Sequence, residues 1–343
     1  LLRSSLGFNG AKFFGLLRSL VGIFLFGIQT YFLSKLVVYL IRIFIFSIDN
    51  TLLEQEIFLI FLLGLNIIDW ISILVVIVFQ TMLFSIGIQY NKKLINYSAI
   101  IVYAGMIIFF FTLFLSDVKT TTQAFSNILN LENFVNENNI LPLITVTGTI
   151  FAYFSIIIVS FGDFSRYVNN EKDLNKGNLG LILNLIIFSF FSVAIVIGSD
   201  VFLNQKFQDL DRIFTNPTDI IGKFDNLQIT IVVLFFIIIA SASTNLVANY
   251  IPSQYSLINF LPNKLNLKSS SYIISFLGFI VGVFWLTVLS QIGILSFVDT
   301  FSCFFGPVFG VIIADYYLIK NENLSNKDLY SIEIQSIYYY SKG

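Results

Sequence analysis

The sequence contains no histidine and only one cysteine, Cys303. Zinc sites built from His and Cys, His-ligated haem and a Ser-His-Asp triad are therefore excluded. A single cysteine cannot form a disulfide within the chain, so cysteine usage does not indicate the redox compartment. The apolar stretches also lack a set of nucleophile, metal-ligating or acid–base residues. We therefore expect neither an enzyme nor a bound cofactor.

Charge is scarce as well. Only 11% of the 343 residues are charged, and 57% are hydrophobic, whereas soluble domains carry about 25% charged residues. So few charges cannot cover a surface that faces water, and the composition predicts an all-α integral membrane protein within a lipid bilayer. The net charge of −1 gives no indication of a nucleic-acid partner.

Apolar runs of spanning length recur along the whole chain. A membrane-spanning helix needs about 20 mostly apolar residues. Eight stretches meet this requirement, namely 13–36, 67–88, 94–116, 141–161, 179–203, 228–250, 271–290 and 293–319. The region 37–64 holds two runs that are too short to span. We expect it to continue the first helix and then to lie at the membrane interface.

The distribution of Lys and Arg predicts the orientation. These residues are more numerous on the side that holds both chain ends than on the opposite side. Because cytoplasmic loops carry the excess of Lys and Arg, we expect a multi-pass protein of the cell membrane, plasma or inner. Both ends of this chain would be cytoplasmic, and the polar segments 117–140 and 204–227 would face outside.

Polar side chains inside a bilayer must face protein or a water-filled cavity, so those within the spans mark candidate sites. Gln29 lies in the middle of the first span. Its amide offers one acceptor and two donors, which suits the edge of a heterocycle. A hydrogen bond between helices is an equally open interpretation.

The sixth span carries two polar stripes. At about 100° per residue, Ser243 and Thr244 share one stripe with Ala240, and Asn245 and Asn249 share another. Two hydroxyls beside a backbone carbonyl are oxygen ligands of the kind that a hard cation prefers. Asn249 is placed to hold an uncharged polar substrate. Small-residue packing between helices is the alternative interpretation of the hydroxyls.

A charged pair ends the fourth span. Asp163 and Arg166 follow Gly162 at the predicted membrane edge. We expect these two side chains to pair with each other or with neighbouring loops, which is a structural role.

Several short blocks stand in a recognisable order. They are 3–11 (RSSLGFNGA), 26–30 (FGIQT), 162–167 (GDFSRY), 243–249 (STNLVAN) with the following Leu261-Pro262, 306–310 (GPVFG) and 314–317 (ADYY). Together they resemble the nucleobase–cation symporter-1 family, the permeases for cytosine, purines, uracil, thiamine, allantoin and hydantoins. The resemblance extends over nearly the whole chain.

The resemblance implies a fold. The eight spans would be helices three to ten of a twelve-helix transporter with a five-plus-five inverted repeat, truncated at both ends. Residues 1–343 would form a single, partial transmembrane transporter domain, with 1–116 as the remainder of the first repeat and 141–319 as the second repeat. Residues 320–343 would be a cytoplasmic tail that leads to further helices.

The resemblance also implies roles for individual residues. The expected substrate-binding amides are Gln29 and Asn249, with Asn245 beside them, and the expected sodium ligands are Ala240 (through its carbonyl), Ser243 and Thr244. Carriers of this family hold the substrate ring between two tryptophans, whose positions are occupied here by Leu25 and Phe154. Phe154 can still stack on a ring and Leu25 cannot, so the substrate can differ from the best-known ones.

The resulting expectation is a secondary active transporter. It would couple a cation to the symport of a nucleobase or related small heterocycle (uracil, cytosine, allantoin, hydantoin or thiamine-precursor type) by alternating access. Sodium is favoured over protons, because both hydroxyls are present in the sixth span. The alternatives are a non-transporting structural membrane protein and a transporter of an unrelated small polar solute.

Overall fold

The apolar stretches form long helices in the computed structural model, which describes residues 2–130, 137–206, 220, 223, 227–331 and 333–340. The α-helices are α1 (Leu2–Ile48), α2 (Ile67–Phe84), α3 (Ile88–Ser116), α4 (Val118–Ile128), α6 (Glu137–Ile158), α7 (Gly162–Ser165), α8 (Glu171–Lys206), α10 (Leu227–Thr244), α11 (Ile251–Phe260), α12 (Leu267–Trp285), α13 (Ile294–Ile313) and α14 (Asn326–Tyr330). Two π-helical segments, η3 (Asn245–Tyr250) and η5 (Ala314–Ile319), continue α10 and α13. Short 3-10 turns are η1 (Asn50–Glu54), η2 (Glu56–Leu59) and η4 (Leu289–Gln291).

The prediction of eight spans is confirmed. Within the described residues, eight helices are long and apolar enough to cross a membrane: Leu2–Ile48, Ile67–Phe84, Tyr90–Ser116, Ile140–Ile158, Glu171–Asn204, Leu227–Phe260, Leu267–Trp285 and Ile294–Ile319. The protein is therefore a multi-pass, all-α membrane protein. The predicted outside segments 117–140 and 204–227 lie partly outside the described residues, and α4 occupies the start of the first one.

Several helix ends differ from the sequence prediction, and local residues explain two of the starts. The helix expected at 271–290 is α12, which begins at Leu267 because Asn266 and Ser269 form a reciprocal capping box, and it ends at Trp285. The helix expected at 179–203 is α8, which begins already at Glu171. The first turn of α8 carries Glu171 and Asp173, whose negative charge favours a helix start.

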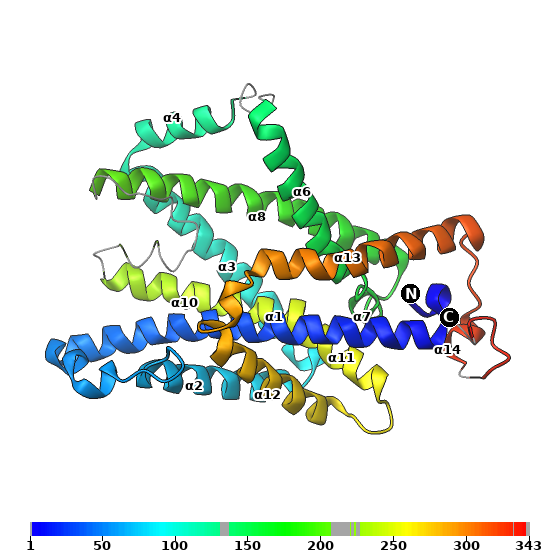
Figure 1. Cartoon of the computed structure of the whole chain (residues 1–343). Helices are drawn as coiled ribbons and strands as arrows, with labels where there is room; N and C mark the ends of the chain where they lie inside the picture. Colours follow the sequence, from blue (N-terminus) through cyan, green and yellow to red (C-terminus); the bar gives the residue numbers. More distant parts are fainter. Residues whose placement is uncertain are drawn as a thin grey trace.

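The longest helix, α1, is the axis of the structure. It continues beyond the predicted span to Ile48, as expected for the start of the region 37–64, and η1 and η2 follow it. In Figure 1, α1 runs along the length of the molecule, with α2 and α12 on one side. The chain formed by α10, η3 and α11 also packs against α1. Separate pairings join α6 to α13, and α3 to both α8 and α10.

Glycines allow α1 and α12 to approach closely. A Cβ atom on Gly27 would lie 2.5 Å from the Gly278 carbonyl oxygen and 2.6 Å from the Val281 Cβ. A Cβ atom on Gly282 would lie 3.1 Å from the Gly27 carbonyl oxygen. Gly278 and Gly282 are four residues apart on α12, which is the spacing that lets membrane helices pack backbone to backbone. This contact fixes the position of Gln29, which lies two residues beyond Gly27.

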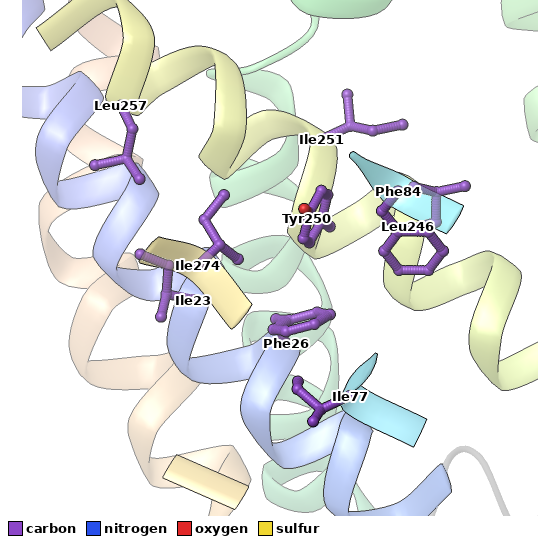
Figure 2. Close-up of a cluster of buried hydrophobic side chains, with 9 residues drawn as sticks. All are labelled: Ile23, Phe26, Ile77, Phe84, Leu246, Tyr250, Ile251, Leu257 and Ile274. Atoms are coloured by element: carbon purple, nitrogen blue, oxygen red, sulfur yellow. The ribbon is translucent and has the colours of Figure 1, made fainter. Parts of the chain in front are cut away.

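An aromatic cluster joins α1 to η3 and α2. The Phe26 and Tyr250 ring centroids are 5.3 Å apart, and those of Phe84 and Tyr250 are 5.0 Å apart. Figure 2 shows Phe26 beneath Tyr250, with Leu246 and Phe84 on the neighbouring segments. All three rings are buried. The cluster therefore holds η3 against the helix that carries Gln29.

Candidate functional site

The amides predicted from the sequence come together in the interior. Asn249 Nδ2 donates to Gln29 Oε1 at 2.9 Å and to Asn245 Oδ1 at 3.0 Å. Gln29 Nε2 donates to the Ser241 carbonyl at 3.1 Å. Gln29 belongs to α1, whereas Asn245 and Asn249 belong to η3. The predicted stripe of Asn245 and Asn249 is thus confirmed, and it faces Gln29.

Asn245 anchors this amide network to α1. It is fully buried, and its Nδ2 lies 3.2 Å from both the Phe26 carbonyl oxygen and Thr30 Oγ1. Thr30 in turn donates to Gln80 Oε1 of α2 at 2.9 Å. We use "amide network" for Gln29, Asn245 and Asn249 with Thr30 and Gln80. It links three helical elements through hydrogen bonds in an otherwise apolar interior.

The local backbone of η3 follows from Pro252. Proline has no N–H, so Pro252 cannot donate to the carbonyl of Ala248, four residues earlier. The backbone widens into the π-helical segment Asn245–Tyr250, which directly precedes α11. Arg18 of α1 donates to this Ala248 carbonyl through its Nη2 at 2.8 Å. Such single π-turns are frequent at functional sites.

The three predicted cation ligands lie together at the end of α10. Ser243 Oγ donates to the Ala240 carbonyl at 3.0 Å, and Thr244 Oγ1 donates to the same carbonyl at 2.8 Å. The three oxygens thus form one local cluster. Each hydroxyl oxygen retains lone pairs while it donates, so the cluster offers oxygen atoms of the kind that a hard cation prefers.

Leu25 and Phe154 were expected to flank a substrate ring, but none of their described contacts joins one to the other. Leu25 lies one turn before Gln29 and packs against two apolar clusters, one around Ile156 and Phe305 and the other around Ile28. Phe154 on α6 is half-buried, and its ring meets the neighbouring Tyr153 edge-on at 5.9 Å. Leu25 therefore contributes apolar surface next to the amide network, and the role of Phe154 stays a prediction.

Asp163 and Arg166, which were expected to pair with each other or with neighbouring loops, interact through their charges without a direct ion pair. The structure gives no ion pair between these two residues, both of which it describes; Arg166 instead stacks 4.0 Å from the Tyr255 ring centre and donates to Tyr167 Oη at 3.1 Å. Tyr167 Oη and Tyr255 Oη are 2.7 Å apart. The pairing is thus with neighbouring elements, because the two tyrosines offer a planar surface that the guanidinium covers. Burial raises the pKa of Asp163 to about 6.

Sequence reasoning missed Thr30, Gln80 and Arg18. Gln80 is a polar residue inside an apolar span, the same signal that identified Gln29, and it is 1% exposed. Arg18 is a charge inside the predicted span 13–36 and is 2% exposed. An intramembrane charge is by default a candidate functional residue.

The described residues form eight apolar helices of spanning length, and a buried network of uncharged polar side chains joins α1, α2 and η3. This combination defines a helical membrane protein of the type to which solute permeases belong. Comparison with known protein families identifies the family within this class. A family model described as "Permease for cytosine/purines, uracil, thiamine, allantoin" matches residues 1–343, and the chain belongs to this family. The resemblance found in the short sequence blocks is thereby confirmed, and the family consists of permeases rather than enzymes.

Three relatives show how far the similarity extends. A purine-uracil permease of Arabidopsis thaliana is 26% identical over 354 residues, which cover 100% of this chain and 54% of the relative. An allantoin permease of Bacillus subtilis is 31% identical over 195 residues, 57% of this chain and 38% of the relative. A putative allantoin permease of Escherichia coli is 27% identical over 352 residues, 99% of this chain and 67% of the relative.

The alignments cover only part of each relative. The chain spans about half the length of the curated relatives it matches. No solved structure matches it significantly.

Proposed function

We propose that the protein is a cation-coupled symporter of a nucleobase or related small heterocycle, and that Gln29 and Asn249 bind the substrate. The observation that carries the proposal is their direct contact inside the membrane domain of a permease family chain. The relatives named for purine, uracil, allantoin and hydantoin transport support this substrate class. The protein would work in the plasma or inner membrane, with both ends of this chain in the cytoplasm.

The contacts leave hydrogen-bonding capacity for a ligand. Gln29 Nε2 has two hydrogens and donates one to the Ser241 carbonyl, which leaves a second. Asn249 uses its Nδ2 group in both described bonds, so its Oδ1 is available as an acceptor. Nucleobases and hydantoins carry an N–H beside a C=O on one edge. The N–H would donate to Asn249 Oδ1, and the C=O would accept from Gln29 Nε2.

Alternating access gives the amide network its place in a transport cycle. Substrate and cation would enter from outside, bind within the membrane domain and leave inward after the helices rearrange. The amide network joins η3 to α1 and α2 through side-chain hydrogen bonds. A bound substrate ring would replace some of these bonds or add further bonds to the same side chains. Only binding that differs between the two states can drive the change.

The experiment that tests this function is uptake by the full-length protein. Cells that express it would be given radiolabelled uracil, cytosine, allantoin, hydantoin or a thiamine precursor, with and without a sodium gradient. We expect saturable uptake of at least one compound above cells that lack the protein. If the protein is folded in the membrane and no compound is taken up, a structural role or an unrelated polar solute is favoured instead.

For the coupling ion we propose sodium, held by the carbonyl of Ala240 and the hydroxyls of Ser243 and Thr244. Their clustering at one carbonyl supports this proposal. Thr244→Ala removes one oxygen ligand, whereas Thr244→Ser keeps it and serves as the matched control. We expect the sodium concentration for half-maximal uptake to rise in Thr244→Ala and to stay near the wild-type value in Thr244→Ser. Equal sodium dependence in all three proteins would contradict the assignment and would favour protons.

A further inference from the structure

A second polar cavity lies against α1, apart from the amide network. Its volume is about 460 Å³, and its lining residues are Leu2, Arg3, Phe8, Ala11, Lys12, Gly15, Arg18, Val159, Ser160, Gly162, Asp163, Ser256, Asn259 and Phe260. They come from the first half of α1, from the region of α7 and from the end of α11. Gln29 lies eleven residues beyond Arg18, or roughly 16 Å at 1.5 Å per helical residue. The lining includes no residue of the amide network, although Arg18 reaches the Ala248 carbonyl next to Asn249.

Arg18 is the buried charge of this cavity. Its Nη2 donates to the Ala248 carbonyl, but its Nε and Nη1 are buried without a hydrogen-bond partner among the described residues. Arg3, which also lines the cavity, has a buried Nε that likewise has no hydrogen-bond partner among the described residues. A buried donor without a partner is costly, and more so when it belongs to a charged group. Nη1 of Arg18 lies beside Gly22, where a Cβ atom would be 2.7 Å from it, and Gly22 does not line the cavity. The buried Nε groups of Arg18 and Arg3, two lining arginines, are therefore the donors that indicate an acceptor here.

The charges around the cavity favour an anion. Arg3 and Lys12 both lie over the Phe8 ring, at 5.4 Å and 4.4 Å from its centre, so the ring holds two cations at the cavity wall. With Arg18 the lining carries three cations, against one carboxylate, that of Asp163. Asp163 lies close enough to Arg18 for the two charges to interact, but these two described side chains form no ion pair within 4 Å, and the lining keeps an excess of positive charge.

We propose that this cavity is a second ligand site, which binds a small organic carboxylate through Arg18. The carboxylate oxygens accept from the Nε–H groups of Arg18 and Arg3, and Lys12 adds positive charge nearby. Ser160, Ser256 and Asn259 supply uncharged polar groups for the rest of the molecule. The cavity has the size of a small-molecule site, which is typically about 300–1,000 Å³. The inference does not depend on the substrate or the ion proposed above.

A matched pair of probes tests the proposal. Nicotinate and nicotinamide share one ring and differ in the carboxylate. The full-length protein would be placed in nanodiscs of phosphatidylcholine alone, so that no anionic headgroup competes, and binding of radiolabelled nicotinate would be measured near neutral pH. The variants are Arg18→Gln, Lys12→Gln and the control Arg42→Gln, which changes an exposed arginine of the same helix. Asn249→Ala separates this site from the amide network.

We expect saturable nicotinate binding that an excess of nicotinamide does not displace. Arg18→Gln should weaken it about tenfold or more, as for the loss of a hydrogen bond to a charged group. Lys12→Gln should weaken nicotinate binding by a smaller factor. This variant still tests the cavity if Arg18→Gln does not fold. Arg42→Gln and Asn249→Ala should leave nicotinate binding unchanged.

Three results would overturn the proposal. The first is absence of saturable nicotinate binding to folded wild-type protein. The second is equal affinity in wild type and both lining variants, Arg18→Gln and Lys12→Gln. The third is loss of binding in Asn249→Ala, which would place the carboxylate at the amide network. Uptake of uncharged heterocycles, measured in the same variants, reports on the proposed function separately.

Discussion

Replacement of Asn245 by alanine is expected to destabilise the protein and to weaken substrate binding, although Asn245 need not touch the substrate. Its side chain makes three hydrogen bonds, to the Phe26 carbonyl, to Thr30 and from Asn249. In membrane proteins a side-chain hydrogen bond between helices is worth about 0.6 kcal/mol on average, so three amount to roughly 2 kcal/mol. The variant also frees Asn249 from one of its two described acceptors.

The assay is thermal unfolding of the full-length protein in detergent, together with the concentration dependence of uptake. About 2 kcal/mol corresponds to a fall of roughly 4 °C in the unfolding midpoint, at the lower end of the scaling for large domains. We also expect the substrate concentration for half-maximal uptake to rise, because Asn249 is less firmly oriented. The control is Asn184→Ala on α8, where an exposed asparagine donates only to the Gly180 carbonyl of its own helix.

A second variant separates hydrogen bonding from packing. Asn245→Leu keeps the branched shape and the number of non-hydrogen atoms but makes none of the three bonds, and it leaves the Phe26 carbonyl and Thr30 without this partner. We expect it to be as unstable as Asn245→Ala or more so. If Asn245→Leu were as stable as wild type and kept normal uptake, the argument that this network orients Asn249 would be refuted.

Two further predictions concern packing and pH. Gly27→Ala should destabilise the protein by about 1–3 kcal/mol, because the new Cβ would lie 2.5 Å from the Gly278 carbonyl oxygen and would push α1 away from α12. The control for thermal unfolding is Gly180→Ala, whose Cβ would meet nothing within 4 Å. Equal unfolding midpoints for the two variants would contradict the close approach of α1 and α12. Burial raises the pKa of Asp163 from 3.8 to about 6, so the folded state binds this proton more tightly than the unfolded state. Stability should therefore fall as pH rises from about 4 to 6, by on the order of 2 kcal/mol, and this part should vanish in Asp163→Asn. Parallel curves of unfolding midpoint against pH for the two proteins would count against a buried Asp163.

Much of the fold could be predicted from the sequence because a bilayer imposes strict conditions. A spanning helix must be long and apolar, and this requirement alone located all eight spans. Their ends were less predictable. The capping box of Asn266 and Ser269 moved the start of α12, and such local hydrogen bonds do not alter the hydropathy of a segment.

The candidate site was predictable where polar residues interrupt apolar sequence. Gln29, Asn245 and Asn249 stood out for this reason, and the structure joins them. The hydrogen bond from Thr30 to Gln80 was not predictable, because it depends on how α1 and α2 pack. The bond of Arg18 is likewise unpredictable, because it joins α1 to the Ala248 carbonyl more than two hundred residues away, to which Pro252 cannot donate.

The most direct test of the central claim is uptake of the transported heterocycle by wild type, Asn249→Ala and the control Asn184→Ala at matched levels of folded protein in the membrane. If Asn249 binds the substrate together with Gln29, uptake at low substrate concentration falls by about tenfold or more in Asn249→Ala. Asn184→Ala should transport like wild type, because its side chain bonds only within α8. Unchanged uptake in Asn249→Ala would contradict the account and would reduce the amide network to a packing element between helices.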